Sequence, residues 1–194
     1  MDAPNTKKPL QAKGTRSEGI ARLLNLLYGL VITTGFGLTF RGLLAGTIPS
    51  SKSCYLFLFF AFIVALCDWV IYQFAAAPFA YQGIRRVFLD LLFPIGLFVI
   101  SLYVNNTCVV LILLALYFGL SAVYALVEVY EVEKLPSWNI RLGFSGAIIC
   151  LVGAELYHLG KVSDTTVAWS FGILVAIPWF CFWFIWLRSK LSSA

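Results

Sequence analysis

The chain has 194 residues, of which 61% are hydrophobic and only 12% are charged, and its mean hydropathy is +0.90. A soluble domain of this length has too small a core to cover so much apolar surface. Disordered chains lack the aromatic residues that make up 16% of this one. Long uninterrupted apolar runs also exclude a transmembrane β-barrel, whose strands alternate polar and apolar residues. The composition therefore predicts an all-α integral membrane protein.

The polar segment 1–21 is expected to be a cytoplasmic tail, because the apolar run that follows it is too long for a cleaved signal peptide. Six apolar runs then come in succession, each near the length of about 20 residues that a spanning helix needs. The runs predict transmembrane helices at about 23–45, 54–75, 87–104, 108–127, 142–160 and 168–187. Together they form a six-helix transmembrane domain over 22–190, followed by a short tail at 191–194.

Lys and Arg residues are distributed unevenly along this chain. If the six helices alternate in direction, eleven of the fourteen basic residues lie on the side of the two termini, and only Arg41, Lys52 and Lys161 lie on the other. Cytoplasmic loops carry the excess of Lys and Arg in membrane proteins. The pattern predicts a bundle with both termini cytoplasmic, without indicating which membrane holds it. The net charge of +5 then reflects topology and a bilayer partner, and no nucleic acid is expected.

Two acidic side chains, Asp68 and Asp90, are expected inside the membrane on its cytoplasmic half. A charged group at the bilayer centre costs about 2.5–3.5 kcal/mol on insertion scales. Arg22, Arg85 and Arg86 are expected at the same depth, so ion pairs with the two Asp residues would offset this cost. The alternative is that these carboxylates bind a transported substrate.

Glu155 and His158 lie three residues apart on the fifth expected helix, so they share a face near its outer end. Arg41 is expected at the same level on the first helix. An interfacial pair of Glu155 with Arg41 would place His158 at the lipid headgroups. The alternative is a proton-linked site, since His titrates near neutral pH.

Catalytic and cofactor signatures are absent from the sequence. There is no metalloprotease, nucleophile-elbow, phosphate-loop or dinucleotide motif, and the five Cys residues lack metal-ligand spacing. We therefore expect neither an enzyme nor a bound cofactor or metal. Cys54 and Cys108 are both expected near the outer surface, and the sequence does not decide whether they form a disulfide.

The first expected helix is unusually rich in small and hydroxyl residues, with Gly29 and Gly37 beside three Thr residues. Such residues allow close helix packing or line a polar path. Leu30, Thr33 and Gly37 recur at helical spacing and form a candidate pore-lining stripe. Tight packing against neighbouring helices is the alternative.

This helix and the next resemble the TMEM175 family of six-helix potassium channels. In that family the first helix carries an Arg and a Phe-Ser-Asp signature, with a Thr eight residues after the Asp. In this chain Asn25 stands at the position of the family Asp, and Thr33 follows eight residues later. Arg22 lies before Asn25, at a spacing that differs from that of the family Arg. Trp69 lies deep in the second helix, as a family Trp does.

The basic turn at Arg85-Arg86 and the run around Asp90 extend the likeness, which covers about residues 22–104. Two features depart from the family. Leu23-Leu24-Asn25 replaces the signature triplet, and the His residues that usually follow the helix-two Trp are absent. The polar network that stabilises the first helix in the family is thus only partly available.

The resemblance implies a homo-oligomer, a tetramer in the family, in which the first helix lines a pore for monovalent cations. Leu30, Thr33 and Gly37 would then form the pore-lining stripe, and selection would come from an apolar constriction and threonine hydroxyls. A second class of function stays open from the residues themselves. In it the chain is a small carrier or an accessory subunit whose intramembrane Asp and Glu residues bind substrate or hold the bundle.

Overall fold

The computed structural model describes residues 11–48, 51–75, 84–132 and 138–191, and these are almost entirely helical. In chain order the elements are α1 (Gln11–Leu30), the π-helical segment η1 (Val31–Phe36), α2 (Gly37–Leu44), α3 (Lys52–Ala75), α4 (Ile84–Leu102), α5 (Thr107–Val132), α6 (Trp138–His158), α7 (Asp164–Phe171), the π-helical segment η2 (Gly172–Ala176) and α8 (Ile177–Leu191). The described residues contain no strand, which confirms the expected all-α class.

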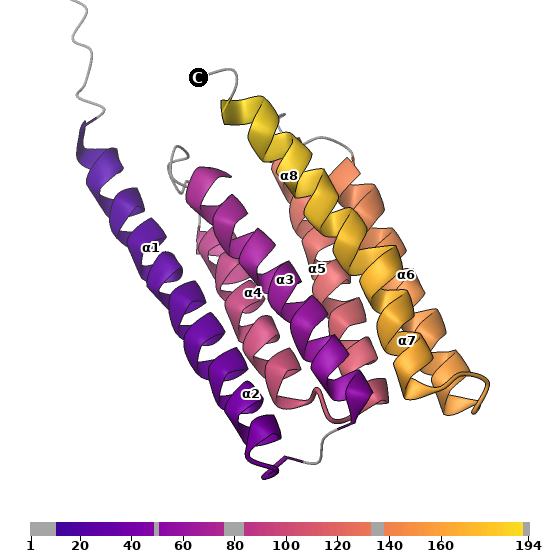
Figure 1. Cartoon of the computed structure of the whole chain (residues 1–194). Coiled ribbons are helices and arrows are strands. Elements are labelled where there is room, and N and C mark those ends of the chain that lie inside the picture. Colours follow the sequence, from indigo (N-terminus) through magenta and orange to yellow (C-terminus); the bar gives the residue numbers. More distant parts are fainter. Residues whose placement is uncertain (1–10, 49–50, 76–83, 133–137, 192–194) are drawn as a thin grey trace, which may run out of the picture.

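Two of the helices continue through a π-helical segment. Residues Leu30 and Gly37 on either side of η1 keep right-handed helical backbone angles, so α1, η1 and α2 form one rod, called helix one below. α7, η2 and α8 form the last rod in the same way. Successive rods run in opposite directions, so helix one begins and α8 ends at the same end of the bundle (Figure 1). Single-turn π-segments inside α-helices often mark functional positions.

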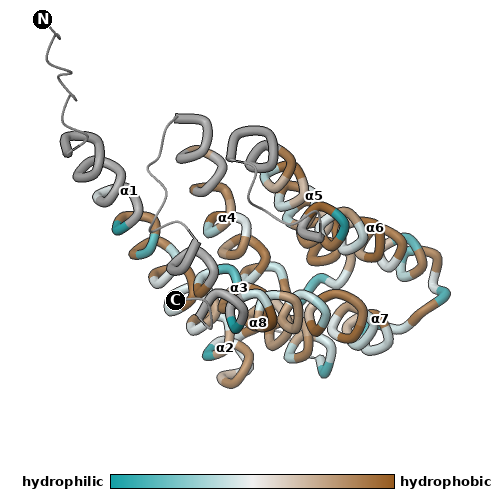
Figure 2. Tube along the Cα trace, turned by 90° about the horizontal axis from the view of Figure 1, so that it is seen from above, coloured by the Kyte–Doolittle hydropathy of each residue, from teal (hydrophilic) through white to brown (hydrophobic). Residues whose placement is uncertain are grey.

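Five of the described helices are long and apolar enough to cross a membrane: helix one, α3, α5, α6 and the α7–α8 rod. α4 has a shorter apolar stretch, Leu91–Leu102. Large apolar side chains also cover much of the outer surface of the described residues. Figure 2 shows that hydrophobic residues make up much of each described helix. The chain is therefore a multi-pass integral membrane protein.

Helix boundaries differ most from the expected ones at two places. Helix one begins at Gln11 instead of near residue 23, because the Gln, Ala, Lys and Arg residues before the apolar run are good helix formers and the two Gly residues among them do not stop the helix. α5 continues to Val132, past the apolar run that ends near residue 127, since Glu also favours helix. Hydropathy thus locates the membrane segment but not the end of the helix.

The most extensive helix packing joins α5 to α6. A Cβ atom added at Gly143 would lie 2.9 Å from the backbone nitrogen of Ala122 and from the carbonyl oxygen of Phe118, so only Gly allows this approach. Helix one, in contrast, lies at one edge of the bundle, where it packs mainly on α3 and α4 (Figures 1 and 2). One whole side of helix one is left uncovered by the described residues.

Candidate functional site

Asp68, on α3, is bound by two aromatic donors from other helices. The hydroxyl of Tyr117 on α5 donates to Oδ2 of Asp68, and Nε1 of Trp179 on α8 donates to Oδ1 at 3.0 Å. Tyr117 and Trp179 are almost fully buried, whereas Asp68 is half-buried. Both carboxylate oxygens are therefore satisfied, and a single side chain connects three helices in the interior.

Aromatic rings surround this carboxylate. The ring of Phe118 lies edge-on to Tyr117 and Trp179, with centroids 5.8 and 5.2 Å apart. Phe93 of α4 lies edge-on to Tyr117 at 5.4 Å. Trp183, one helical turn after Trp179, has its ring centroid 6.0 Å from Trp179, and its Nε1 is buried without a hydrogen-bond partner among the described residues. Water is thus largely excluded from the groups that bind Asp68.

Trp69, the next residue on α3, connects this region to helix one. Its Nε1 donates to Oδ1 of Asn25 at 2.7 Å. Asn25 and Trp69 belong to the intramembrane network expected from the sequence, and the structure brings these two members into contact. Two adjacent residues of α3, Asp68 and Trp69, therefore join it to α5, α8 and helix one at about one depth.

A second attachment holds helix one to α4. The hydroxyl of Thr39 donates to the carbonyl oxygens of Gly35 and Ser101, at 2.8 and 3.1 Å, and the Thr39 side chain is buried. A Cβ atom at Gly35 would lie 2.8 Å from Oγ of Ser101, so this Gly in η1 permits the close approach. Hydrogen bonds thus attach one face of helix one to the bundle in both its first and its second half.

The opposite face of helix one carries the candidate pore-lining stripe. Leu30 is 57% exposed, and Thr33 and Gly37 are also exposed. The hydroxyl of Thr33 donates to the carbonyl oxygen of Gly29 at 2.8 Å. Because the proton of the Thr33 hydroxyl is used in this bond, the lone pairs of the Thr33 oxygen remain available to an electropositive partner. The stripe is therefore not used for packing against the rest of the described structure.

Of the expected ion pairs, the one between Asp68 and Arg22 is not formed in the structure. Asp68 accepts from Tyr117 and Trp179 and has no ion pair with Arg22, whose exposed side chain has other interactions. Buried aromatic N–H and O–H groups satisfy the carboxylate without a cation. The side chains of Arg85, Arg86 and Asp90 lie outside the described ones.

The expected pair of Glu155 with Arg41 is not formed either. Both side chains are exposed, but Arg41 lies on α2 at one edge of the bundle and Glu155 on α6 at the other (Figure 1). His158 is exposed at the end of α6. Similar depth in the membrane does not make two helices neighbours, which is why the expectation failed.

Sequence reasoning missed Tyr117 and Trp179 as partners of Asp68. The available signal was a phenol and an indole near the middle of apolar runs, since such polar tips need a partner when buried. The described residues contain no group of His, Cys, Asp and Glu that suits a metal ion, and Cys54 and Cys108, both among the described residues, are not joined by a disulfide.

Comparison with family models, curated proteins and solved structures finds no match to this chain. The class of protein that the fold defines is an all-α, multi-pass integral membrane protein. Its function is to be argued from two features: the Asp68 site in the interior and the uncovered stripe of helix one.

Proposed function

We propose that this chain is the subunit of a cation channel in which helix one, from several copies, lines the pore. The observation that carries this proposal is the uncovered stripe of Leu30, Thr33 and Gly37 on a helix whose other face is bonded to the bundle. A bundle of this size has no room for an aqueous pore within one chain, so a pore needs more than one copy. The resemblance to six-helix potassium channels favours four copies and a monovalent cation.

The pore would select by the two kinds of group on the stripe. Leu30 side chains from all copies would make an apolar ring, which conducts only when it is wide enough to hold water. Thr33 oxygens, one turn further along, would offer lone pairs to a cation that has lost part of its hydration shell. The Asn25–Trp69 and Thr39–Ser101 bonds would hold helix one at a fixed rotation, so that the stripe faces the axis.

The proposal includes six membrane spans with both termini cytoplasmic. α4 runs antiparallel to α3 and α5 and packs on both (Figure 1), which favours it as the sixth span beside the five longer apolar helices. On helix one, the exposed Arg22 and Arg41 are 19 residues apart. At 1.5 Å per residue this is about 28 Å, close to the thickness of a hydrocarbon core. Arg22 and Arg41 would therefore lie at the depths of the two opposite membrane surfaces.

Surface labelling tests this topology. In sealed cells, a membrane-impermeant amine reagent is expected to label Lys161, in the loop between α6 and α7, and to leave Lys8 and Lys190 unlabelled. Permeabilised cells provide the control, because all three lysines should then react. Labelling of Lys8 and Lys190 in sealed cells would contradict the orientation.

Changes on the stripe test the channel itself. Leu30→Ala is expected to widen and wet the apolar ring, so that potassium flux into liposomes rises and selectivity over sodium falls. Thr33→Val keeps the shape but removes the hydroxyl, so selectivity should change while the oligomer still assembles. The flux of reconstituted variants measures both effects.

Leu116 on α5 is the matched control for Leu30, because it is similarly exposed, at 66%, but lies on another helix. Leu116→Ala should leave flux and selectivity unchanged. If Leu30→Ala behaves like Leu116→Ala, helix one does not line a pore.

A carrier or accessory subunit is the second candidate function, and the Asp68 site favours it. An acidic side chain enclosed by buried aromatic groups is a suitable binding site for a cationic substrate. In this alternative Asp68 would exchange Tyr117 and Trp179 for the substrate, and the stripe would face lipid. The oligomeric state in mild detergent separates the two candidates, since a monomer without flux favours the carrier or accessory role.

A further inference from the structure

Arg41 lies on the same face of helix one as the candidate stripe. The uncovered residues of helix one repeat every three or four positions: Leu26, Leu30, Thr33, Gly37, Arg41 and Leu44 are all exposed. Arg41 is eight residues beyond Thr33, which places it about 12 Å further along the axis. It is near the end of α2, at the end of the bundle opposite to the termini.

The charge of Arg41 is not neutralised by a neighbour within the described part of the chain. Residues 22–44 of helix one contain no Asp or Glu. Arg41 forms no ion pair among the described side chains, and Glu155 is at the other edge of the bundle. If several copies place their stripes around one axis, their Arg41 side chains come together as well.

We propose that Arg41 forms a ring of positive charge at the outer mouth of the pore, which lowers the local concentration of cations and reduces their influx. This inference rests on the proposed channel. A charged ring at a narrow mouth changes the local ion concentration through its potential. The potential acts mainly on ions arriving from outside, so the ring makes outward cation current larger than inward current at equal driving force. It does not alter selection between cations deeper in the pore.

The ring predicts a strong dependence on ionic strength. The Debye length is about 30 Å at 0.01 M salt and about 3 Å at 1 M, so the effect should be large in dilute salt and lost in concentrated salt. Arg41→Gln should raise inward current about two- to threefold in dilute salt, and Arg41→Glu should raise it further because it reverses the potential. Neither variant should change inward current at 1 M salt.

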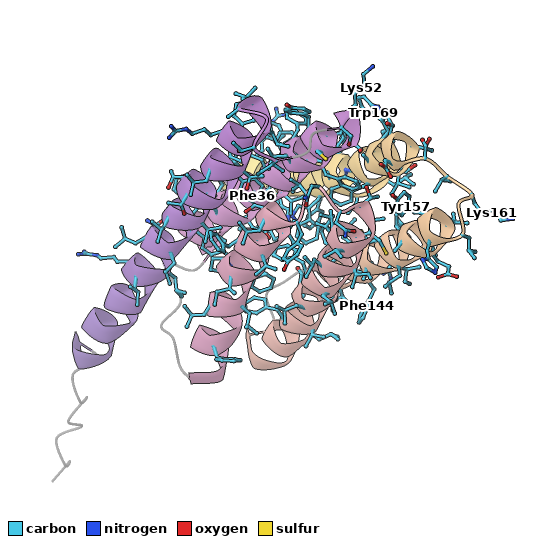
Figure 3. All side chains as sticks on the ribbon, turned by 90° about the horizontal axis from the view of Figure 1, so that it is seen from below. Phe36, Lys52, Phe144, Tyr157, Lys161 and Trp169 are labelled. Carbon is cyan, nitrogen blue, oxygen red and sulfur yellow. The ribbon has the colours of Figure 1, made fainter. Side chains whose placement is uncertain are left out.

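Lys161 provides the matched control, because it is an exposed cation at the same end of the bundle but projects from the far edge, away from helix one (Figure 3). Currents through planar bilayers are compared for Arg41→Gln and Lys161→Gln in dilute and concentrated salt. A change in rectification with Arg41→Gln alone supports the ring. Equal behaviour of the two variants overturns it and assigns Arg41 to lipid headgroups, where Arg side chains also reach.

Cross-linking separates a failed ring from a failed channel. Arg41→Cys should form covalent oligomers with a short bifunctional maleimide, while Lys161→Cys, with the same native cysteines, should not. Cross-links at position 41 without any flux would show that the Arg41 residues of several copies lie close together and would refute the channel. Flux in the wild type without cross-links at position 41 would refute the ring and keep the channel. Absence of both would refute the two together.

Discussion

Asp68→Ala is expected to lower the free energy of unfolding by about 2–5 kcal/mol, because it leaves two buried donors without an acceptor. The Tyr117 hydroxyl and the Trp179 indole are only 3% and 2% exposed as residues, so water does not replace the lost carboxylate. Asp68→Asn should cost less, since its amide oxygen still accepts from one of the two donors. Equilibrium unfolding in mixed micelles, or the thermal midpoint in mild detergent, measures the loss.

A double-mutant cycle identifies the partner. The combination of Asp68→Ala with Tyr117→Phe should destabilise the protein by clearly less than the sum of the two single changes, because both changes remove the same hydrogen bond between Tyr117 and Asp68. The combination with Arg22→Gln should be additive, since these side chains do not interact in the structure. Additivity with Tyr117→Phe and coupling with Arg22→Gln would restore the ion pair expected from the sequence.

Why the sequence led to the wrong partner for Asp68 has a physical answer. Hydropathy and the distribution of basic residues indicate depth in the membrane, and at its depth Arg22 was the natural partner by charge. Which side of a helix faces which neighbour depends on the packing of side chains around the bundle, and no local pattern contains that information. The same limit explains Arg41 and Glu155, which share a depth but lie at opposite edges.

Where the information is local, the sequence was sufficient. The all-α class and five long apolar helices follow from apolar runs, since a run of about 20 residues has few alternatives in a membrane. The small and hydroxyl residues of helix one were visible too. Their division into an attached face with Gly35 and Thr39 and an uncovered face with Thr33 and Gly37 was not, because both faces contain Gly and Thr.

Gly143→Ala is expected to destabilise the bundle by about 1–3 kcal/mol, the usual cost of extra volume in a well-packed core. The added Cβ atom would lie 2.9 Å from the backbone of α5 at Phe118 and Ala122. A backbone cannot rotate away as a flexible side chain can, so α5 and α6 would have to separate. This contact lies in the most extensively packed pair of described helices, so the separation would weaken packing along both helices.

Gly119→Ala, on α5, is the matched control, because nothing lies within 4 Å of the Cβ atom that it would add. The same chemical change should be neutral there or slightly stabilising, since Ala favours helix over Gly by about 0.5–1 kcal/mol. Unfolding of both variants in the same detergent compares them directly. If Gly143→Ala is as stable as Gly119→Ala, α5 and α6 are further apart than 2.9 Å contacts allow. The α5–α6 pair would then not be the rigid part of the bundle against which Tyr117 holds Asp68.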